Sequence, residues 1–271
     1  MGSTHNPNHN HLLAALPVAE FERLSPHLEL VHMPLGEVLC EIGGNFHHVY
    51  FPTTSIVSMH LAMENGASAE MTQVGNEGML GIAIVMAGNT TGAFVMTAGY
   101  GYRLRVQLLT DEFNRGQQMQ RLLLRYTQAL MTQTSQTATC HRRHTLEQQL
   151  CRWLLLTLDR IPSNESSLTQ EQVASMLGGQ REEITEVIEK LQQAGIVRNR
   201  RGHITVLDRS GLEDLACECY DVVKTEFNRL LENVEQKPTA KFHEVLKKAR
   251  QIFGGKQDVA QSQRGSGTPG W

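Results

Sequence analysis

Hydrophobic and polar residues follow two different periods along this chain. From Leu28 to Leu109, short apolar and β-branched runs are separated by Gly and Pro, and Asn65-Gly66 suits a tight hairpin turn because both residues tolerate positive φ. Strands are expected over residues 30–33, 38–40, 48–51, 56–63, 67–74, 93–97 and 100–106. Many short strands at near-regular spacing predict an antiparallel sandwich or small barrel.

The period becomes helical over residues 113–139. Met119, Leu123, Tyr126 and Leu130 fall at alternating spacings of four and three, which is typical of a coiled-coil seam. A single helix packed on the core is the alternative. We favour a homodimer with these four residues at its interface.

The stretch 168–191 predicts two helices with a sharp turn between them. Thr169 and Gln172 fit a capping box, and Gly178-Gly179 suits the end of the first helix. The expected inward positions of the second helix are Ile184, Val187, Ile188 and Leu191, and its outer face carries Gln180, Arg181, Glu182, Thr185 and Glu186. This pattern is typical of a helix-turn-helix whose second helix enters the DNA major groove, although an ordinary αα-hairpin with a solvated face would share it.

The residues after this hairpin favour the DNA-binding interpretation. Residues 196–206 form two β-branched runs around a basic turn that contains Gly202. A two-stranded ribbon directly after a helix-turn-helix indicates a winged helix. Arg200 and Arg201, at the expected tip, suit contacts to DNA phosphates.

Residues 168–197 and the wing sequence RGHITVLD resemble the C-terminal domain of Crp/Fnr-type transcription regulators, and the resemblance extends upstream to about His11. It implies an α+β fold with an N-terminal antiparallel β-roll of the cyclic-nucleotide-binding type, a long dimerisation helix and a C-terminal winged helix. The expected boundaries are 11–112 for the sensor, 113–140 for the helix and 141–233 for the DNA-binding domain. Residues 234–271 form an extension that is expected to be partly disordered. Arg181 and Glu182 match an Arg-Glu pair that members of the family use to read bases.

The resemblance also implies an effector pocket in the β-roll. Its candidate residues are Gly75, Glu77, Gly78, Gly81, Thr90 and Thr91. The arginine that would hold a cyclic phosphate is missing, because residues 81–102 contain no Lys or Arg. An unpaired buried phosphate is costly, so cyclic AMP is expected to bind poorly or not at all. The effector is therefore unknown, and no cofactor is required.

The composition of the chain indicates how it could bind DNA and where in the cell it is expected. The 271 residues are 40% hydrophobic and 20% charged, with a formal net charge of −3. Because the net charge is negative, DNA binding must rest on local positive charge. No apolar run approaches the roughly 20 residues that span a bilayer, and no signal segment is recognisable, so a cytoplasmic protein without membrane contact is expected.

The five cysteines are scattered, which favours reduced thiols over a disulfide framework. Cys40 alone lies in the first hundred residues, so the N-terminal iron–sulfur cluster of some relatives is not expected. Cys217 and Cys219 are two apart in an expected helix over residues 211–231, which would turn them to nearly opposite faces. No metal site is therefore predicted.

The leading hypothesis is a dimeric, sequence-specific transcription regulator that is not an enzyme. Its β-roll would sense an unidentified signal and reorient paired winged helices on a palindromic operator in double-stranded DNA, with RNA polymerase as a possible further partner. One alternative is a signal- or cyclic-nucleotide-binding module whose winged helix makes protein contacts. Another is a metal-dependent cupin enzyme, but the adjacent His47 and His48 would point to opposite faces of a strand and form no ligand set.

Overall fold

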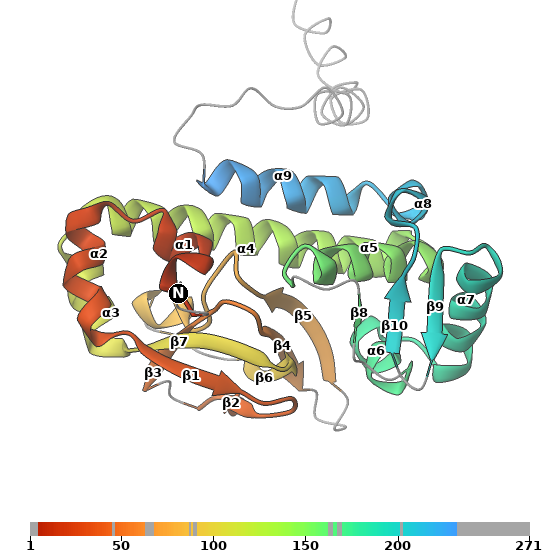
Figure 1. Cartoon of the computed structure of the whole chain (residues 1–271), viewed down its shortest axis with the longest axis horizontal. Helices are drawn as coiled ribbons and strands as arrows, with labels where there is room; N and C mark the ends of the chain where they lie inside the picture. The colour runs from red at the N-terminus through yellow and green to blue at the C-terminus, as the bar shows by residue number, and fades with distance from the viewer. Residues whose placement is uncertain are drawn as a thin grey trace, which may run out of the picture. The chain divides into compact units, whose positions relative to one another are not determined.

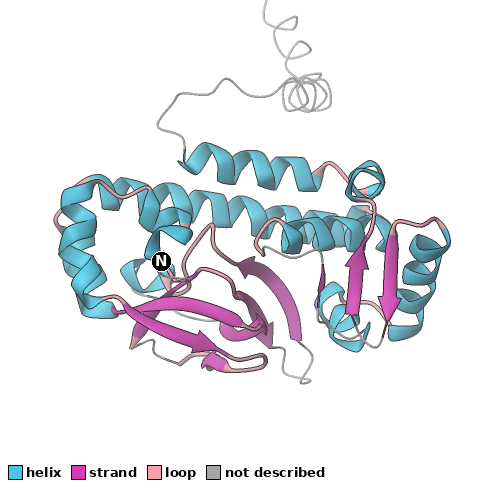
Figure 2. Cartoon of the chain, in the orientation of Figure 1, coloured by secondary structure: helices cyan, strands magenta, loops and turns pink. Residues whose placement is uncertain are grey.

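The structure is a computed structural model, which describes residues 5–44, 47–62, 68–86, 88, 91–161, 165–166, 170–200 and 203–231. The chain divides into two compact units, Met1–Glu232 and Asn233–Trp271. All described residues belong to the first unit (Figures 1 and 2). Residues 234–271 lie outside the described residues, so their expected partial disorder stays a prediction.

Short helices precede the first strand. They are the 3₁₀ turn η1 (Pro7–His9), α1 (His11–Ala14), α2 (Val18–Leu24) and the 3₁₀ turn η2 (Ser25–His27). Pro17 is the N-cap of α2, where its missing N–H costs no helical hydrogen bond. The side chain of Asn10 caps α1 and also donates to the carbonyls of Pro52 and Gly78, so this segment is tied to the strands that follow.

The strands form two antiparallel sheets, as the period-two pattern predicts. They are β1 (Glu29–Met33), β2 (Val38–Cys40), β3 (His48–Pro52), β4 (Ile56–Ala62), β5 (Ser68–Val74), β6 (Gly92–Thr97) and β7 (Gly99–Arg105). The sheet orders are β1-β7-β3 and β2-β6-β4-β5. Every strand expected from the sequence is present, and β4 and β5 pair as the expected hairpin, although Asn65-Gly66 lies outside the described residues.

A short helix separates the β-roll from the long helix. α3 (Val106–Asn114) follows β7 directly, and the chain turns at Gly116, whose φ is +72°, before α4 (Gln118–Arg143). The buried carboxylate of Glu20 caps α4 by accepting from the backbone N–H groups of Gln118 and Met119 at 3.2 and 2.7 Å. This cap fixes the start of α4 against the N-terminal helices.

The residues after α4 form the second half of the fold. Their elements are α5 (Leu146–Leu158), β8 (Glu165–Ser166), α6 (Gln170–Leu177), α7 (Arg181–Gln193), β9 (Val197–Arg200), β10 (His203–Val206), α8 (Arg209–Leu215) and α9 (Cys219–Leu231). Thr145 and Gln148 cap α5 reciprocally. In Figure 1, α9 lies beside α4, and the two helices are in contact. None of the described helices combines the length and hydropathy needed to cross a bilayer.

The seam predicted on α4 faces the interior of the chain. Met119, Leu123, Tyr126 and Leu130 are 0–9% exposed, in the same core cluster as residues of the β-roll and α9. The Tyr126 hydroxyl donates to the carbonyl of Met79 at 2.9 Å. Packing of the β-roll and α9 on α4 therefore accounts for the apolar spacing without a second chain.

The prediction of one helix through Cys217 and Cys219 is wrong. α8 ends at Leu215, and Ala216 is extended with φ −72° and ψ 151°, so the chain changes direction before α9 begins. Because the two cysteines do not share a helix, they do not point to opposite faces. Both are buried in one cluster with Cys140 from the end of α4.

Candidate nucleic-acid interface

The helix-turn-helix forms as its apolar pattern predicts. Val173, Met176 and Leu177 of α6 are buried, and Gly178 ends the helix with φ +69°. The inward residues of α7, which are Ile184, Val187, Ile188 and Leu191, are at most 8% exposed. Thr169 and the side chain of Gln172 lie outside the described residues, so the predicted capping box stays a prediction.

The first turn of α7 presents charged side chains to solvent. Glu183 accepts from the backbone N–H of Gln180 at 3.0 Å and so caps the helix. Arg181, Glu182 and Glu186 are exposed. Thr185, which is half-buried, donates to Gln170 of α6 at 3.0 Å and helps to hold the two helices together.

The wing places further cations beside α7. β9 pairs antiparallel with β10, which also pairs with β8, and the Asn199 N–H donates to Gln192 of α7 at 2.9 Å. Arg198 and Arg200 are both exposed, and their spacing of two puts them on one face of β9. Arg198 is not among the residues predicted from the sequence, although strand alternation could have indicated it. Arg201 lies outside the described residues.

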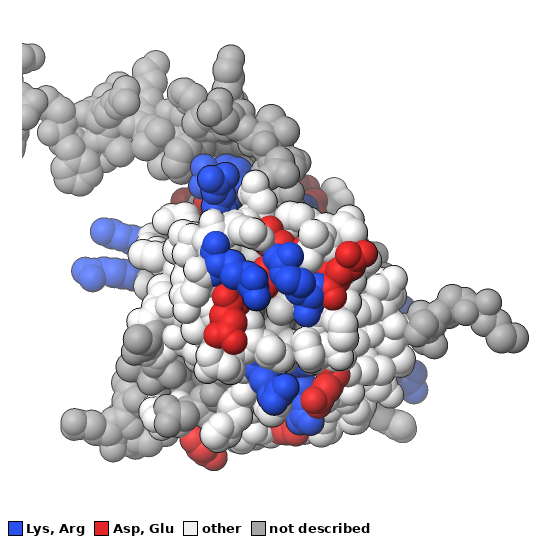
Figure 3. Space-filling view, turned by 90° about the vertical axis from the view of Figure 1, so that its left-hand side faces the viewer, with Lys and Arg blue, Asp and Glu red and all other residues white. Residues whose placement is uncertain are grey.

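Positive and negative side chains are mixed on the end of the molecule that carries α2 and α3 (Figure 3). There Arg23 and Arg115 both pair with the buried Glu112. Arg103 on β7 is paired with Glu29 at 2.7 Å. These arginines form ion pairs with carboxylates. Their positive charge therefore attracts a polyanion less strongly than the charge of the exposed arginines of α7 and β9 does.

The predicted effector residues mostly contact other parts of the chain. A side chain at Gly75 would collide with Arg160, and one at Gly78 would collide with the Tyr126 ring. Gly81 has φ +98°, which favours glycine. Thr91 is 8% exposed, and Thr90 lies outside the described residues.

Glu77 takes part in a buried ion pair with the second half of the fold. Its carboxylate accepts from Arg160 Nε at 2.6 Å and from the Gly75 N–H at 3.1 Å. Arg160 also donates to Gln133 of α4 at 3.2 Å. Glu77 and Arg160 line a cavity of about 230 Å³ together with Asn76, Lys224 and Phe227, among other residues.

Further hydrogen bonds join β5 to α5. Trp153 Nε1 donates to Glu70 at 3.0 Å, and the Thr157 hydroxyl donates to Gln73 at 3.2 Å. Burial raises the pKa of Glu70, while donors from Ser58, Gln73 and Trp153 act in the opposite direction. The β-roll and the helix that leads to the helix-turn-helix are thus linked by buried polar groups, which sequence patterns do not reveal.

Comparison with known proteins identifies the domain that carries the helix-turn-helix and shows which solved structures have a similar fold. Residues 148–215 match the Crp-like helix-turn-helix domain. No curated protein matches the chain. Similar solved structures include a Crp/Fnr-family transcriptional regulator from Eubacterium rectale, with 19% identity over 77% of this chain and 98% of that chain and a TM-score of 0.57. FixK2 from Bradyrhizobium japonicum has 15% identity over 70% of this chain and 98% of its own, with a TM-score of 0.61.

The matched domain contains α6, α7 and both strands of the wing, so it includes the exposed Arg181, Arg198 and Arg200. The solved structures extend the likeness in fold to the β-roll and α4. The α+β fold expected from the sequence is therefore confirmed. Residues 148–215 therefore form a Crp-like helix-turn-helix domain, and the fold as a whole is similar to that of solved Crp/Fnr-family regulators.

Proposed function

We propose that the protein acts as a homodimer that reads a palindromic operator with α7, under the control of a signal sensed by the β-roll. The observation that carries the proposal is the exposed first turn of α7, with Arg181 and Glu182, together with the exposed arginines of β9. In a helix-turn-helix, the N-terminal residues of the second helix meet base edges, while neighbouring cations contact phosphates.

The side chains of this turn suit a site that contains a G·C pair. Arginine can donate to guanine O6 and N7, and glutamate can accept from cytosine N4. Arg181 and Glu182 would supply these contacts. Glu186, one turn further along α7, carries a negative charge that phosphates repel, so the operator should differ from those of relatives with a cation there. Arg198, Arg200 and Arg201 would bind the wing to the phosphates of the DNA backbone.

The dimer is proposed to form through the exposed face of α4. Leu124 and Met131 are 53% and 61% exposed, and their spacing of seven positions places them on one face of α4. They belong to an exposed stripe with alternating spacings of three and four, which consists of Arg121, Leu124, Gln128, Met131, Ser135, Ala138 and Arg142. This spacing suits a two-stranded coiled coil, so the stripe replaces the buried residues as our candidate interface.

The signal is proposed to act on the polar contacts between the β-roll and α5. Glu77 and Arg160 connect the loop after β5 to α5, and Gln133 extends the connection to α4. A ligand that binds better to one arrangement of these groups would shift the winged helices between two states. We propose an effector other than cyclic AMP, because residues 81–102 contain no cation.

The alternative is a signal-binding module whose winged helix contacts proteins. The two functions differ in how binding depends on salt. A DNA-binding protein that neutralises several phosphates loses affinity for duplex DNA steeply as salt rises, because counterions are released on binding. A winged helix used for protein contacts would bind duplex DNA weakly at any salt concentration.

Arg181→Ala should weaken binding to the preferred operator by about 1–3 kcal/mol and relax the preference at one base pair. Arg200→Ala should weaken binding to all DNA sequences alike. It should also make the affinity less dependent on salt concentration, because it removes a phosphate contact. Fluorescence anisotropy on the sequence selected by the wild-type protein, and on single-base variants of it, measures both effects.

Lys190→Ala is the matched control for Arg181→Ala. Lys190 is exposed on the same helix and carries the same charge, but it lies about two and a half turns from the first turn. The control should keep the base preference of the wild type. If Arg181→Ala also kept both the affinity for the operator and the base preference, the first turn of α7 would not be the part that contacts the bases.

A further inference from the structure

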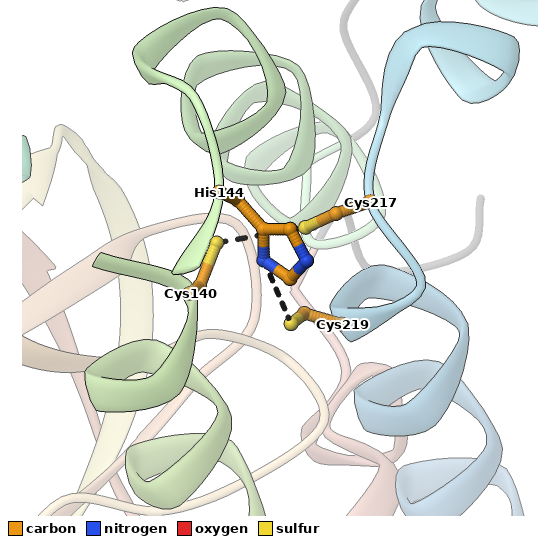
Figure 4. A group of neighbouring side chains, drawn as sticks. All are labelled: Cys140, His144, Cys217 and Cys219. Carbon is orange, nitrogen blue, oxygen red and sulfur yellow. Dashed lines mark hydrogen bonds between the residues drawn. The ribbon is translucent and has the colours of Figure 1, made fainter. Parts of the chain in front are cut away.

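A second group of side chains, at the junction of α4 with α9, has the composition of a metal site. Cys140 and His144 come from the end of α4, Cys217 precedes α9, and Cys219 is the first residue of α9 (Figure 4). The three thiols are buried, and the side chain of His144 is 14% exposed. We propose that these four residues bind one zinc ion.

The spacing of the ligand atoms suits a single ion. All four lie within 4.8 Å of one another, with Cys140 Sγ and Cys217 Sγ 3.5 Å apart and Cys219 Sγ 3.6 Å from His144 Nδ1. A tetrahedral zinc ion with Zn–S bonds of about 2.3 Å holds its sulfur ligands about 3.8 Å apart. In a four-iron cluster each thiolate binds a different iron, so the ligand sulfurs would stand farther apart.

The surroundings of His144 also suit a metal ligand. Nδ1 faces the thiols, and Nε2 lies 3.3 Å from the carboxylate of Glu218. Histidines that bind zinc commonly donate their second ring N–H to a carboxylate, which orients the ring and leaves the other nitrogen free to bind the ion. Glu218 therefore has a role in the site although it touches no thiol.

The charges around the cluster also favour a zinc site. Zinc with three thiolates and a neutral imidazole carries one net negative charge. Arg152 of α5 is 2% exposed, and its Nε has no hydrogen-bond partner among the described residues. The positive charge of Arg152 is close enough to act on the Cys140 thiol. The bound ion would provide this buried cation with a nearby anionic site.

A disulfide is the main competing explanation for close cysteines. Cys140 and Cys217 are near enough to be joined by a modest movement, since a disulfide needs an S–S distance of about 2.05 Å. It would leave Cys219 and the pairing of His144 with Glu218 unexplained. A structural zinc site uses all four residues and has no open position, as expected for buried ligands.

Metal analysis of the purified, reduced full chain tests the proposal. We expect about one zinc ion per chain to survive dialysis and the Cys217→Ser variant to lose it. Cys40→Ser is the matched control, because Cys40 is a buried cysteine of the β-roll outside the cluster and should leave the zinc content unchanged. Cobalt(II) added to the metal-free wild type should give the intense visible absorption of a tetrahedral thiolate site, and this readout does not depend on the folding of a variant.

Glu218→Gln tests the geometry with a variant that should fold, because this side chain is 60% exposed. Loss of the carboxylate should weaken zinc affinity by about 10–100-fold in competition with a chelating dye. Asp214→Asn, at an exposed carboxylate of α8, should leave the affinity unchanged. Three results would overturn the proposal: no binding of zinc or cobalt by the reduced wild type, bound iron with inorganic sulfide, or a Cys140–Cys217 disulfide in place of the metal.

Discussion

Replacing Leu124 and Met131 together with glutamate should convert the proposed dimer to a monomer. In the proposed interface these side chains meet their counterparts from the second chain, so the variant would bury four carboxylates without partners, at a large desolvation cost. Sedimentation velocity should show one species of 30.3 kDa. Affinity for a palindromic operator should fall by about 100-fold or more, because a monomer reads one half-site and contacts fewer phosphates.

Two further variants separate loss of the dimer from other damage. Leu35→Glu with Val38→Glu changes two apolar side chains of similar exposure, 50% and 56%, in the β-roll and should leave a dimer. Leu123→Glu with Leu130→Glu changes buried residues and should unfold the chain, which circular dichroism would detect. If the variant at Leu124 and Met131 still sedimented as a dimer, the exposed stripe of α4 would not be the interface.

Glu77→Ala should lower the free energy of unfolding by about 3–5 kcal/mol, because it leaves a buried guanidinium without its carboxylate. The side chain of Arg160 is 4% exposed, and its Nε lies 2.6 Å from Glu77. Urea unfolding followed by circular dichroism measures the change. Glu213→Ala is the control, because Glu213 and Arg209 are both 42% exposed and such a pair contributes about 0–1 kcal/mol.

Arg160→Met in the Glu77→Ala background should recover part of the lost stability. Methionine fills much of the same space and carries no charge, so no unpaired ion remains in the interior. A cost below about 1 kcal/mol for Glu77→Ala would mean that water reaches Arg160 and that the pair contributes little to the link between the β-roll and α5.

The strands and the helix-turn-helix could be predicted from the sequence because each has a local signal. The β-roll strands are short apolar and β-branched runs between turn residues, and Gly178 ends α6 where the apolar stripe stops. The reciprocal cap of Thr145 and Gln148 is a local motif of the same kind. Such signals depend on neighbours within a few positions, so they survive without knowledge of the tertiary structure.

The face of α4 that packs inside the chain could not be predicted from its pattern alone. The helix carries apolar residues on more than one face, and spacings of three and four describe both the buried residues such as Leu123 and the exposed ones such as Leu124. Only the packing of the β-roll and α9 decides which face is covered. The ion pair of Glu77 with Arg160 was hidden for a similar reason, since the partners lie 83 positions apart.

The cysteine cluster had a partial signal in the sequence. Cys140 and His144 are four positions apart at the end of a helix, which brings their side chains near one another, and Cys217-Glu218-Cys219 is a close pair of thiols. The prediction of one continuous helix through Cys217 and Cys219 placed these thiols on opposite faces and so gave no indication of a shared site. The extended backbone at Ala216 is what brings both thiols toward α4.

Selection of bound sequences from random duplex DNA by the full-length protein tests the central claim most directly. If α7 is the reader in a dimer, the enriched sequences should contain two inverted half-sites, about 10–10.5 base pairs or a multiple of this apart, each with a G·C pair. Arg181→Ala should lose the preference at that pair in both half-sites. Absence of enrichment, or an enriched motif that Arg181→Ala leaves unchanged, would contradict the account.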